Sequence, residues 1–245
     1  MTAQLDARVA RRLLVVSAHA ADFVWRAAGA IATVTRRGGS ALVVALSYGE
    51  RGESGELWAQ PGQTVERVKA IRHEEASRAA EVLGASFRCL DWGDYPLEAG
   101  TERVEELASV IREWAPDVIL THTERDPFNP DHPVAYQATE RARQLASGAG
   151  VASAFQTVRP AEVLAFEPHQ SEVCGFVPTT FLDITPVFAL KRQAMEAVAS
   201  QRYLVDYYTA TAQRRANHAR RLSGDRGIQY AEAFQRLLPQ VVREL

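Results

Sequence analysis

The sequence has few of the residues from which disulfide-stabilised domains and sulfur-rich metal sites are built. Only two of its 245 residues are cysteines, Cys89 and Cys174. Two thiols can form neither a disulfide framework nor a four-thiolate zinc site. We therefore expect both cysteines to be buried and to behave as small hydrophobic residues.

Long apolar runs are also missing. The longest stretch without a charged residue covers residues 144–158 and is rich in Gly, Ser and Ala, whereas a membrane span needs about 18 or more strongly apolar residues. Near the N-terminus, Arg11 and Arg12 precede only a short apolar run, which does not reach the length of a signal-peptide core. The sequence therefore predicts a cytoplasmic protein with no membrane partner.

The chain has no excess of positive charge either. It contains 28 Lys and Arg against 30 Asp and Glu, a formal net charge of -2. A dedicated nucleic-acid binder needs a basic surface, so we expect no nucleic-acid partner. The basic run at residues 214–221 contains no aromatic residues on which bases could stack. We expect it to form a solvent-exposed or subunit-facing helix, and we expect the protein to be a homo-oligomer.

What the sequence does contain is typical of one globular domain. Hydrophobic residues make up 47% of the chain and charged residues 24%, a balance that is common in folded soluble proteins. At about 150 residues per domain, the length gives fewer than two domains. We expect a single domain over residues 1–245.

Strands and helices alternate in the predicted secondary structure. Apolar runs typical of buried parallel strands alternate with helical patterns, the strands at residues 13–18, 41–48, 86–92 and 117–122 and the helices at residues 22–36, 64–83 and 101–114. A long loop is expected at residues 49–62, and Thr64 and Gly84 are suitable first and last caps for the second helix. The pattern predicts an α/β fold, a Rossmann-like and mostly parallel sheet flanked by helices.

The regular alternation of predicted strands and helices ends after residue 150. Two more strands are expected at residues 162–167 and 180–184, followed by one long or broken helix at residues 186–222. In a parallel sheet, ligands bind outside the carboxyl ends of the strands. His19 and His122 end two of the predicted strands, so we expect the functional residues at that edge.

Three residues near that edge could hold a metal ion. His19 ends the first predicted strand, Asp22 follows three residues later, and His132 opens a helix after the fourth strand. Two imidazoles and one carboxylate leave a coordination position open, as in catalytic zinc sites. Helix caps and core histidines would explain the same residues without a metal.

Several segments in order along residues 13–140 resemble the PIG-L (LmbE-like) zinc-dependent superfamily. The similar segments are Leu14-Val-Val-Ser-Ala-His19-Ala-Ala-Asp22, Gly29-Ala-Ile-Ala, Ser47-Tyr-Gly-Glu50-Arg-Gly52, Arg72-His-Glu-Glu75 and Asn129-Pro-Asp131-His132. The resemblance implies that His19, Asp22 and His132 are zinc ligands. Because this donor set also resembles that of non-haem iron enzymes, zinc is an expectation from the family.

Two departures from the pattern of the PIG-L deacetylases stand at catalytic positions. Ala21 replaces the aspartate that serves as general base, and Asn129 replaces a histidine that helps to polarise the amide carbonyl. Loss of a general base typically lowers a rate by about 10²–10⁴-fold. The sequence thus predicts a retained metal site without the usual deacetylase machinery.

Further segments resemble the 4-oxalomesaconate hydratases, which belong to the same superfamily. They are Ser17-Ala-His-Ala-Ala-Asp-Phe-Val-Trp-Arg26, Gly49-Glu-Arg-Gly-Glu-Ser54, Asp91-Trp-Gly-Asp-Tyr-Pro96 and Phe166-Glu-Pro-His-Gln170. This resemblance implies a zinc-dependent addition of water to 4-oxalomesaconate (4-carboxy-2-hydroxymuconate), giving 4-carboxy-4-hydroxy-2-oxoadipate in gallate and protocatechuate breakdown.

Hydration of a double bond needs a base for the water and an acid for the carbon. Glu53 is the predicted base and His169 the predicted acid, with Glu50 as the alternative base. Each of them could also be an ordinary charged or surface residue. Asp126 and Asp131 could orient imidazoles, or cap the helix that follows.

The tricarboxylate substrate needs polar and cationic contacts. Substrate binding is predicted for Glu50, Arg51, Arg72 and Asn129, with Arg26, Arg125 and Arg226 as further candidates. Arginine suits this task because its planar guanidinium binds carboxylates with two hydrogen bonds. For each arginine taken alone, a structural salt bridge is an equally good explanation.

Two other functions remain open at this point. The first is a zinc-dependent N-deacetylase of an N-acetylated small molecule, in which Glu53 replaces the missing aspartate. The second is a binding protein with a structural metal, which an open three-ligand site suits poorly.

Overall fold

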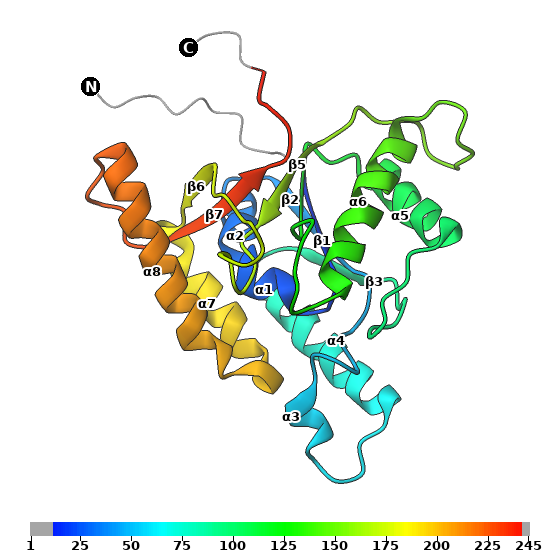
Figure 1. Ribbon diagram of the computed structural model, residues 1–245, viewed down its shortest axis with the longest axis horizontal. Coiled ribbons are helices and arrows are strands. Elements are labelled where there is room, and N and C mark those ends of the chain that lie inside the picture. Colours follow the sequence, from blue (N-terminus) through cyan, green and yellow to red (C-terminus); the bar gives the residue numbers. More distant parts are fainter. Residues whose placement is uncertain (1–11, 242–245) are drawn as a thin grey trace.

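Seven strands form a single sheet in residues 12–241, the part of the chain that the computed structural model describes (Figure 1). Their spatial order is β3-β2-β1-β4-β5-β7-β6. In chain order the strands are β1 (Arg12–Ser17), β2 (Ser40–Ala45), β3 (Ser86–Cys89), β4 (Val118–Thr121), β5 (Glu162–Phe166), β6 (Thr180–Asp183) and β7 (Ala231–Arg236). The first five strands run parallel, whereas β7 is antiparallel to both β5 and β6.

The central strands are apolar along almost their whole length because helices cover both faces of the sheet. In β1, Leu13 and Val15 pack into one hydrophobic cluster, and the alternate residues Leu14 and Val16 pack into the other. This alternation follows from the two-residue period of a strand. The sheet is therefore the middle layer of three.

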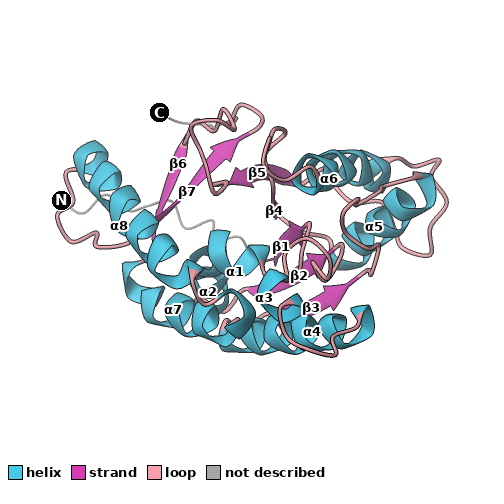
Figure 2. Cartoon of the chain, turned by 60° about the horizontal axis from the view of Figure 1, so that its bottom comes forward, coloured by secondary structure: helices cyan, strands magenta, loops and turns pink. Residues whose placement is uncertain are grey.

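The helices divide unequally between the two faces (Figure 2). They are α1 (Asp22–Arg26), α2 (Ala28–Arg36), α3 (Gly55–Trp58), α4 (Val65–Val82), α5 (Thr101–Trp114), α6 (Asp131–Ser147), α7 (Phe188–Ala197) and α8 (Leu204–Ser223), with short 3-10 turns η1 (Thr185–Val187) and η2 (Ala199–Gln201). Helices α5 and α6 cover one face, and α1, α2, α4, α7 and α8 supply the core of the other. Among residues 12–241, none of the helices is both long and apolar enough to cross a membrane.

The parallel α/β architecture agrees with the prediction, and so do the caps of α4. The side chain of Thr64 accepts a hydrogen bond from the Arg67 amide at 3.3 Å, and Gly84 has a φ of +70°. Glycine adopts this left-handed backbone without steric strain. Local signals of this kind can be identified directly in the sequence.

The predicted helix at residues 22–36 is wrong in one respect, because it is two helices separated by Ala27. The amides of Gly29 and Ala30, which open α2, each donate a hydrogen bond of 2.8 Å to the carboxylate of Glu232 on β7. A carboxylate at a helix N-terminus satisfies amides that have no partner inside the helix. This contact spans the length of the chain, so no local sequence pattern reveals it.

The structure differs from the prediction in three further places. The predicted loop at residues 49–62 contains the short helix α3, and the predicted helix at residues 186–222 is divided into α7 and α8 by η2. Strand β7 was not predicted at all. Its sequence, AEAFQR, carries Glu232 on a buried position, which masks the usual apolar pattern of a strand.

Glu232 also forms a buried ion pair that ties α1 to the C-terminal part of the chain. Lys191 on α7 donates to the Glu232 carboxylate at 2.7 Å and to the Trp25 carbonyl at 2.9 Å. Because both ionic side chains are buried, each requires the other's charge and hydrogen bonds. Strand β7 and helix α7 thereby fix the backbone of α1.

Candidate active site and metal centre

A cavity of about 250 Å³ lies beside α1, at the carboxyl ends of the parallel strands. The predicted metal ligands and catalytic residues line this cavity, and so do three of the predicted substrate-binding candidates: His19, Asp22, Glu53, His132 and His169, with Arg26, Arg72 and Asn129. Arg125 and Arg226, two of the further candidates, do not line it. The lining residues come from the loops after β1, β2, β4 and β5 and from helices α1, α4 and α6. The location agrees with the edge predicted from the strand pattern.

Glu50 and Arg51 lie outside the lining of the cavity, although both were expected to bind substrate. The Glu50 carboxylate is buried 3.8 Å from the Lys69 ammonium, and burial raises its pKa. The backbone amide of Arg51 donates to Asp94, and its guanidinium donates to the Asp94 carbonyl at 3.3 Å. These contacts organise the loop after β2, and neither side chain is part of the cavity wall.

His19, Asp22 and His132 converge on one point. Asp22 Oδ2 lies 3.4 Å from His19 Nδ1, and Asp22 Oδ1 lies 3.6 Å from His132 Nε2. Both imidazole nitrogens are buried and have no hydrogen-bond partner among the residues that the structure describes. Unsatisfied buried polar atoms are rare in proteins and need an explanation, and a bound cation between the three side chains provides one.

Two aspartates orient the imidazoles from the other side. Asp131 Oδ2 is 3.1 Å from His19 Nε2, and Asp126 Oδ2 is 2.8 Å from His132 Nδ1. Asp131 is itself fixed by hydrogen bonds from two backbone amides in the loop between β3 and α5. A carboxylate on one nitrogen of an imidazole leaves the other nitrogen free to bind a metal, so this part of the site suits a divalent cation.

Two other groups with metal-like spacing are less suitable. In one of them His122 joins Asp22 and His132, but His122 Nε2 accepts a hydrogen bond from the Ala18 amide at 2.9 Å. In the other, the oxygens of Asp94 and Asp131 accept hydrogen bonds from backbone amides. The single lone pair of His122 Nε2 is used by this hydrogen bond, and Asp94 and Asp131 each hold backbone amides of neighbouring loops, so these groups are better explained as structural.

The electrostatic environment also favours a positive charge at this point. Burial opposes the charged form of His19, but hydrogen bonds to Asp131 and Asp22 and nearby carboxylates outweigh it and raise the pKa of His19 to about 10. Although burial works against ionisation of Asp22, the neighbouring His122 and His132 hold its pKa well below the usual range. These interactions favour an ionised Asp22 carboxylate with a positive charge beside it.

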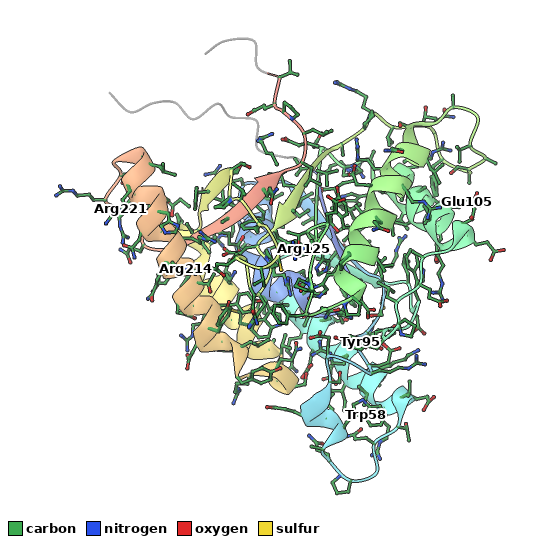
Figure 3. The ribbon with its side chains drawn as sticks, viewed as in Figure 1. Trp58, Tyr95, Glu105, Arg125, Arg214 and Arg221 are labelled. Carbon is green, nitrogen blue, oxygen red and sulfur yellow. The ribbon has the colours of Figure 1, made fainter. Side chains whose placement is uncertain are left out.

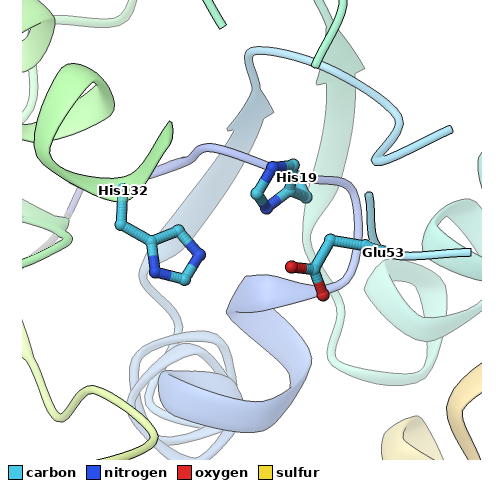
Figure 4. A group of neighbouring side chains, drawn as sticks. All are labelled: His19, Glu53 and His132. Carbon is cyan, nitrogen blue, oxygen red and sulfur yellow. The ribbon is translucent and has the colours of Figure 1, made fainter. Parts of the chain in front are cut away.

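Glu53 approaches the same point from the loop after β2. Its carboxylate forms a group with His19 and His132 in which the three ligand atoms lie within 4.8 Å of one another (Figure 4). Asn129 Nδ2 donates to Glu53 Oε1 at 2.6 Å, and Gln201 Nε2 donates to Oε2 at 3.2 Å. The side-chain amide of Asn129 thus holds the carboxylate of Glu53.

Gly49 makes this approach possible. Its φ is +69°, and a Cβ atom on it would lie 3.0 Å from Glu53 Cβ and 3.1 Å from His19 Cβ. Any other residue here would be strained in its backbone and would push Glu53 away from His19. Ala21 also lines the cavity, and its methyl group can accept no proton.

The opposite wall comes from residues after position 150. His169 stacks on the ring of Tyr207 at 4.1 Å, and its Nδ1 lies 3.5 Å from the Tyr208 hydroxyl. Burial and the positive charge of Arg26 lower the pKa of His169. The lowered pKa favours the neutral form of the imidazole.

Sequence reasoning missed several lining residues, among them Trp25, Gln201, Tyr203 and Tyr208. Gln201 belongs to η2, the turn that interrupts the predicted long helix. Tyr208 stacks on Trp25 at 5.6 Å, although the two are far apart in the chain. Only tertiary packing brings them together, so the sequence contains no local signal for their role.

Comparison with known proteins now identifies the family. Residues 14–143 match the family described as PIG-L: GlcNAc-PI de-N-acetylase. This is more than half of the chain, and it contains His19, Asp22, Glu53 and His132. The chain belongs to the PIG-L family.

More specific similarity extends beyond that region. The chain is 46% identical to a 4-oxalmesaconate hydratase of Pseudomonas putida over 95% of this chain and 91% of that protein. The crystal structure of GalB, the 4-carboxy-2-hydroxymuconate hydratase from Pseudomonas putida KT2440, superposes with a TM-score of 0.93 at 45% identity, covering 96% of this chain and 99% of that one. A 1D-myo-inositol 2-acetamido-2-deoxy-alpha-D-glucopyranoside deacetylase of Nocardia farcinica is 28% identical over 77% of this chain and 80% of its own length.

Proposed function

We propose that this protein is a metal-dependent hydratase that adds water to 4-carboxy-2-hydroxymuconate, also called 4-oxalomesaconate. The observation that carries the proposal is a donor set for a cation beside Ala21, which lines the cavity and which the resemblance places at the position of the deacetylase base. The similarity to hydratases, which includes the residues after position 143, supports it.

The reaction adds one water across a carbon–carbon double bond, with its hydroxyl on one carbon and a proton on the other. Zinc, held by Asp22 and by His19 and His132, whose facing nitrogens lie 3.4 and 3.6 Å from the Asp22 carboxylate, would supply a Lewis acid that polarises a substrate oxygen. Glu53, held by Asn129 and Gln201, takes a proton from the attacking water. His169 lines the same cavity and gives a proton to the second carbon.

We infer zinc as the metal from the resemblance to the zinc-dependent superfamily, because two imidazoles and one carboxylate with an open position suit both zinc and non-haem iron. Measuring the metal content of protein purified without added ions tests this assignment. The role in gallate and protocatechuate breakdown stays a prediction from the resemblance, and the cytoplasmic location and self-association stay predictions from the sequence. We further propose that the chain acts as one domain, because both ends of the sheet contribute to the cavity.

The decisive experiment follows the ultraviolet absorbance of the conjugated substrate with zinc-loaded protein. A hydratase removes the conjugation, so the absorbance falls and 4-carboxy-4-hydroxy-2-oxoadipate accumulates. Unchanged absorbance, together with release of acetate from an N-acetyl sugar, would contradict the proposal.

An N-deacetylase is the second candidate, favoured by the position of Glu53 beside His19 and His132. The Ala21→Asp variant separates the two functions, because it restores the carboxylate at the position of the deacetylase base. A deacetylase would gain rate from this change. A hydratase gains none, and metal content should remain unchanged in the variant.

A further inference from the structure

The cavity has two arginines in its wall, and they differ in how they are bonded. Arg72 is almost fully buried, with 1% of its side chain exposed. Its guanidinium donates to Ser200 at 2.7 Å, Glu75 at 3.2 Å and Gln201 at 3.3 Å, and its Nε donates to the Tyr48 carbonyl at 3.3 Å. With these bonds made, Arg72 has little capacity left for a ligand.

Arg26 differs from Arg72 in its hydrogen bonding. It is the last residue of α1, and 7% of its side chain is exposed. Its guanidinium makes no hydrogen bond to any residue in the range 12–241, and its Nε is one of the buried atoms without a partner. The nearest carboxylate oxygen, Asp22 Oδ1, lies 3.7 Å from Nε, beyond hydrogen-bond distance.

Burying a guanidinium without hydrogen bonds is strongly unfavourable, so its position needs an explanation. The backbone holds Arg26 in place, because Lys191 binds the carbonyl of the preceding Trp25 and Glu232 caps the helix that follows. The carbon of the guanidinium lies 5.8 Å from the centre of the Phe166 ring, which limits its movement on that side. Arg26 is therefore a preorganised cation in the wall of the cavity.

Balancing the negative charges of Asp22 and Asp126 is the simplest structural explanation for Arg26. It accounts for the positive charge but leaves the buried Nε–H of the guanidinium without an acceptor. A cation bound at Asp22 would take over the charge balance there, and this donor would still be unsatisfied. A ligand with a carboxylate supplies two acceptors in the geometry that matches the guanidinium.

We propose that Arg26 binds a carboxylate of the substrate, and that Arg72 acts on substrate only indirectly, by positioning Gln201. This inference deepens the proposed function and rests on it, since the proposed substrate carries three carboxylates. Arg26 thereby becomes the first candidate for binding a substrate carboxylate, whereas the sequence had favoured Arg51 and Arg72.

The test compares Arg26→Gln and Arg26→Lys with wild type in steady-state hydration assays of zinc-loaded protein. Loss of a charge-assisted bidentate contact should raise KM about 10–100-fold in the Gln variant, with kcat changed less. Lysine keeps the charge but not the paired donors, so it should restore only part of the loss. Arg221→Gln removes the same charge at an exposed position that projects outward from α8 (Figure 3) and should leave KM unchanged.

A second measurement separates ligand binding from support of the metal site. Tricarballylate, an inert tricarboxylate, is titrated calorimetrically into zinc-loaded wild type and Arg26→Gln, with glutarate as the dicarboxylate lacking one group. Weaker tricarballylate binding in the variant, with little change for glutarate and an unaltered zinc content, supports the proposal. An unchanged KM, or an Arg26→Gln protein that has lost its zinc, overturns it.

The outcomes also distinguish this inference from the proposed function. A wild-type protein that does not hydrate 4-carboxy-2-hydroxymuconate refutes the proposed function. Tricarballylate binding that depends on Arg26 would then support a polycarboxylate ligand of another kind. Tricarballylate binding that is absent, or equal in the variant, would refute the role of Arg26 as well.

Discussion

The two ends of the sheet contribute different things to the cavity. Strands β1 to β4 and the loops that follow them provide the candidate metal ligands, the aspartates that orient them and the carboxylate of Glu53. Strands β5 to β7, with α7 and α8, provide His169, Gln201 and Tyr208. The family match covers only the first group, whereas the similarity to the Pseudomonas putida hydratase covers both. Most of the second region therefore lies outside the family match but within the similarity to the hydratase.

Removing a predicted metal ligand should give the largest effect. In His132→Ala, the site loses an imidazole that Asp126 orients, and we expect loss of bound zinc with a fall in kcat of more than about 10³-fold, because several kcal/mol of Lewis-acid stabilisation disappear. Metal analysis and turnover measure the two effects. His73→Ala on α4 is the control and should keep both. Full zinc occupancy in His132→Ala would remove the basis for assigning the metal to the first region.

Neutralising Glu53 tests whether chemistry and metal binding can be separated within the first region. Glu53→Gln retains the shape of the side chain, so kcat should fall about 10²–10⁴-fold through loss of the base, while zinc remains bound. Metal content and single-turnover rates are measured together. Glu56→Gln, on the exposed side of α3, should behave as wild type. A Glu53→Gln enzyme with normal kcat would point to another base.

The connection between the two regions is tested by Glu232→Gln. This change leaves Lys191 buried without its counter-charge, and breaking such a pair should lower the free energy of unfolding by about 3–5 kcal/mol. Denaturant unfolding measures the loss. The matched control is Glu196→Gln in the exposed pair with Arg192 on α7, which should change stability by less than about 1 kcal/mol. Equal effects from both variants would show that β7 does not secure the site.

The smallest effect is expected from the residue that orients His132. Asp126→Asn retains a hydrogen-bond acceptor but loses the charge, and zinc affinity should fall about 10–100-fold. Competition with a chromogenic chelator measures the dissociation constant. Asp183→Asn, on the exposed edge of the sheet, should leave it unchanged. Equal affinity in Asp126→Asn and wild type would assign Asp126 to the loop structure alone.

The sequence predicted the first region better than the second. Strand and helix patterns up to residue 147 are regular, and His19, Asp22 and His132 lie close to strand and helix ends, where pattern and family resemblance identify them. The break at Ala27 and the strand β7 were not predictable, because each depends on a contact between distant segments. The guanidinium of Arg72 also illustrates the limit, since only the packed structure shows that its donors are already used.

The carboxylate of Glu232, which accepts hydrogen bonds from the first amides of α2, limits the order in which the protein can fold. Glu232 follows Gly29 by 203 positions in the chain, so this cap cannot form until the chain has been synthesised at least as far as β7. Until then the second helix lacks these acceptors for its opening amides. The pocket that contains Asp22 is therefore completed only after β7 has been synthesised and has joined the sheet.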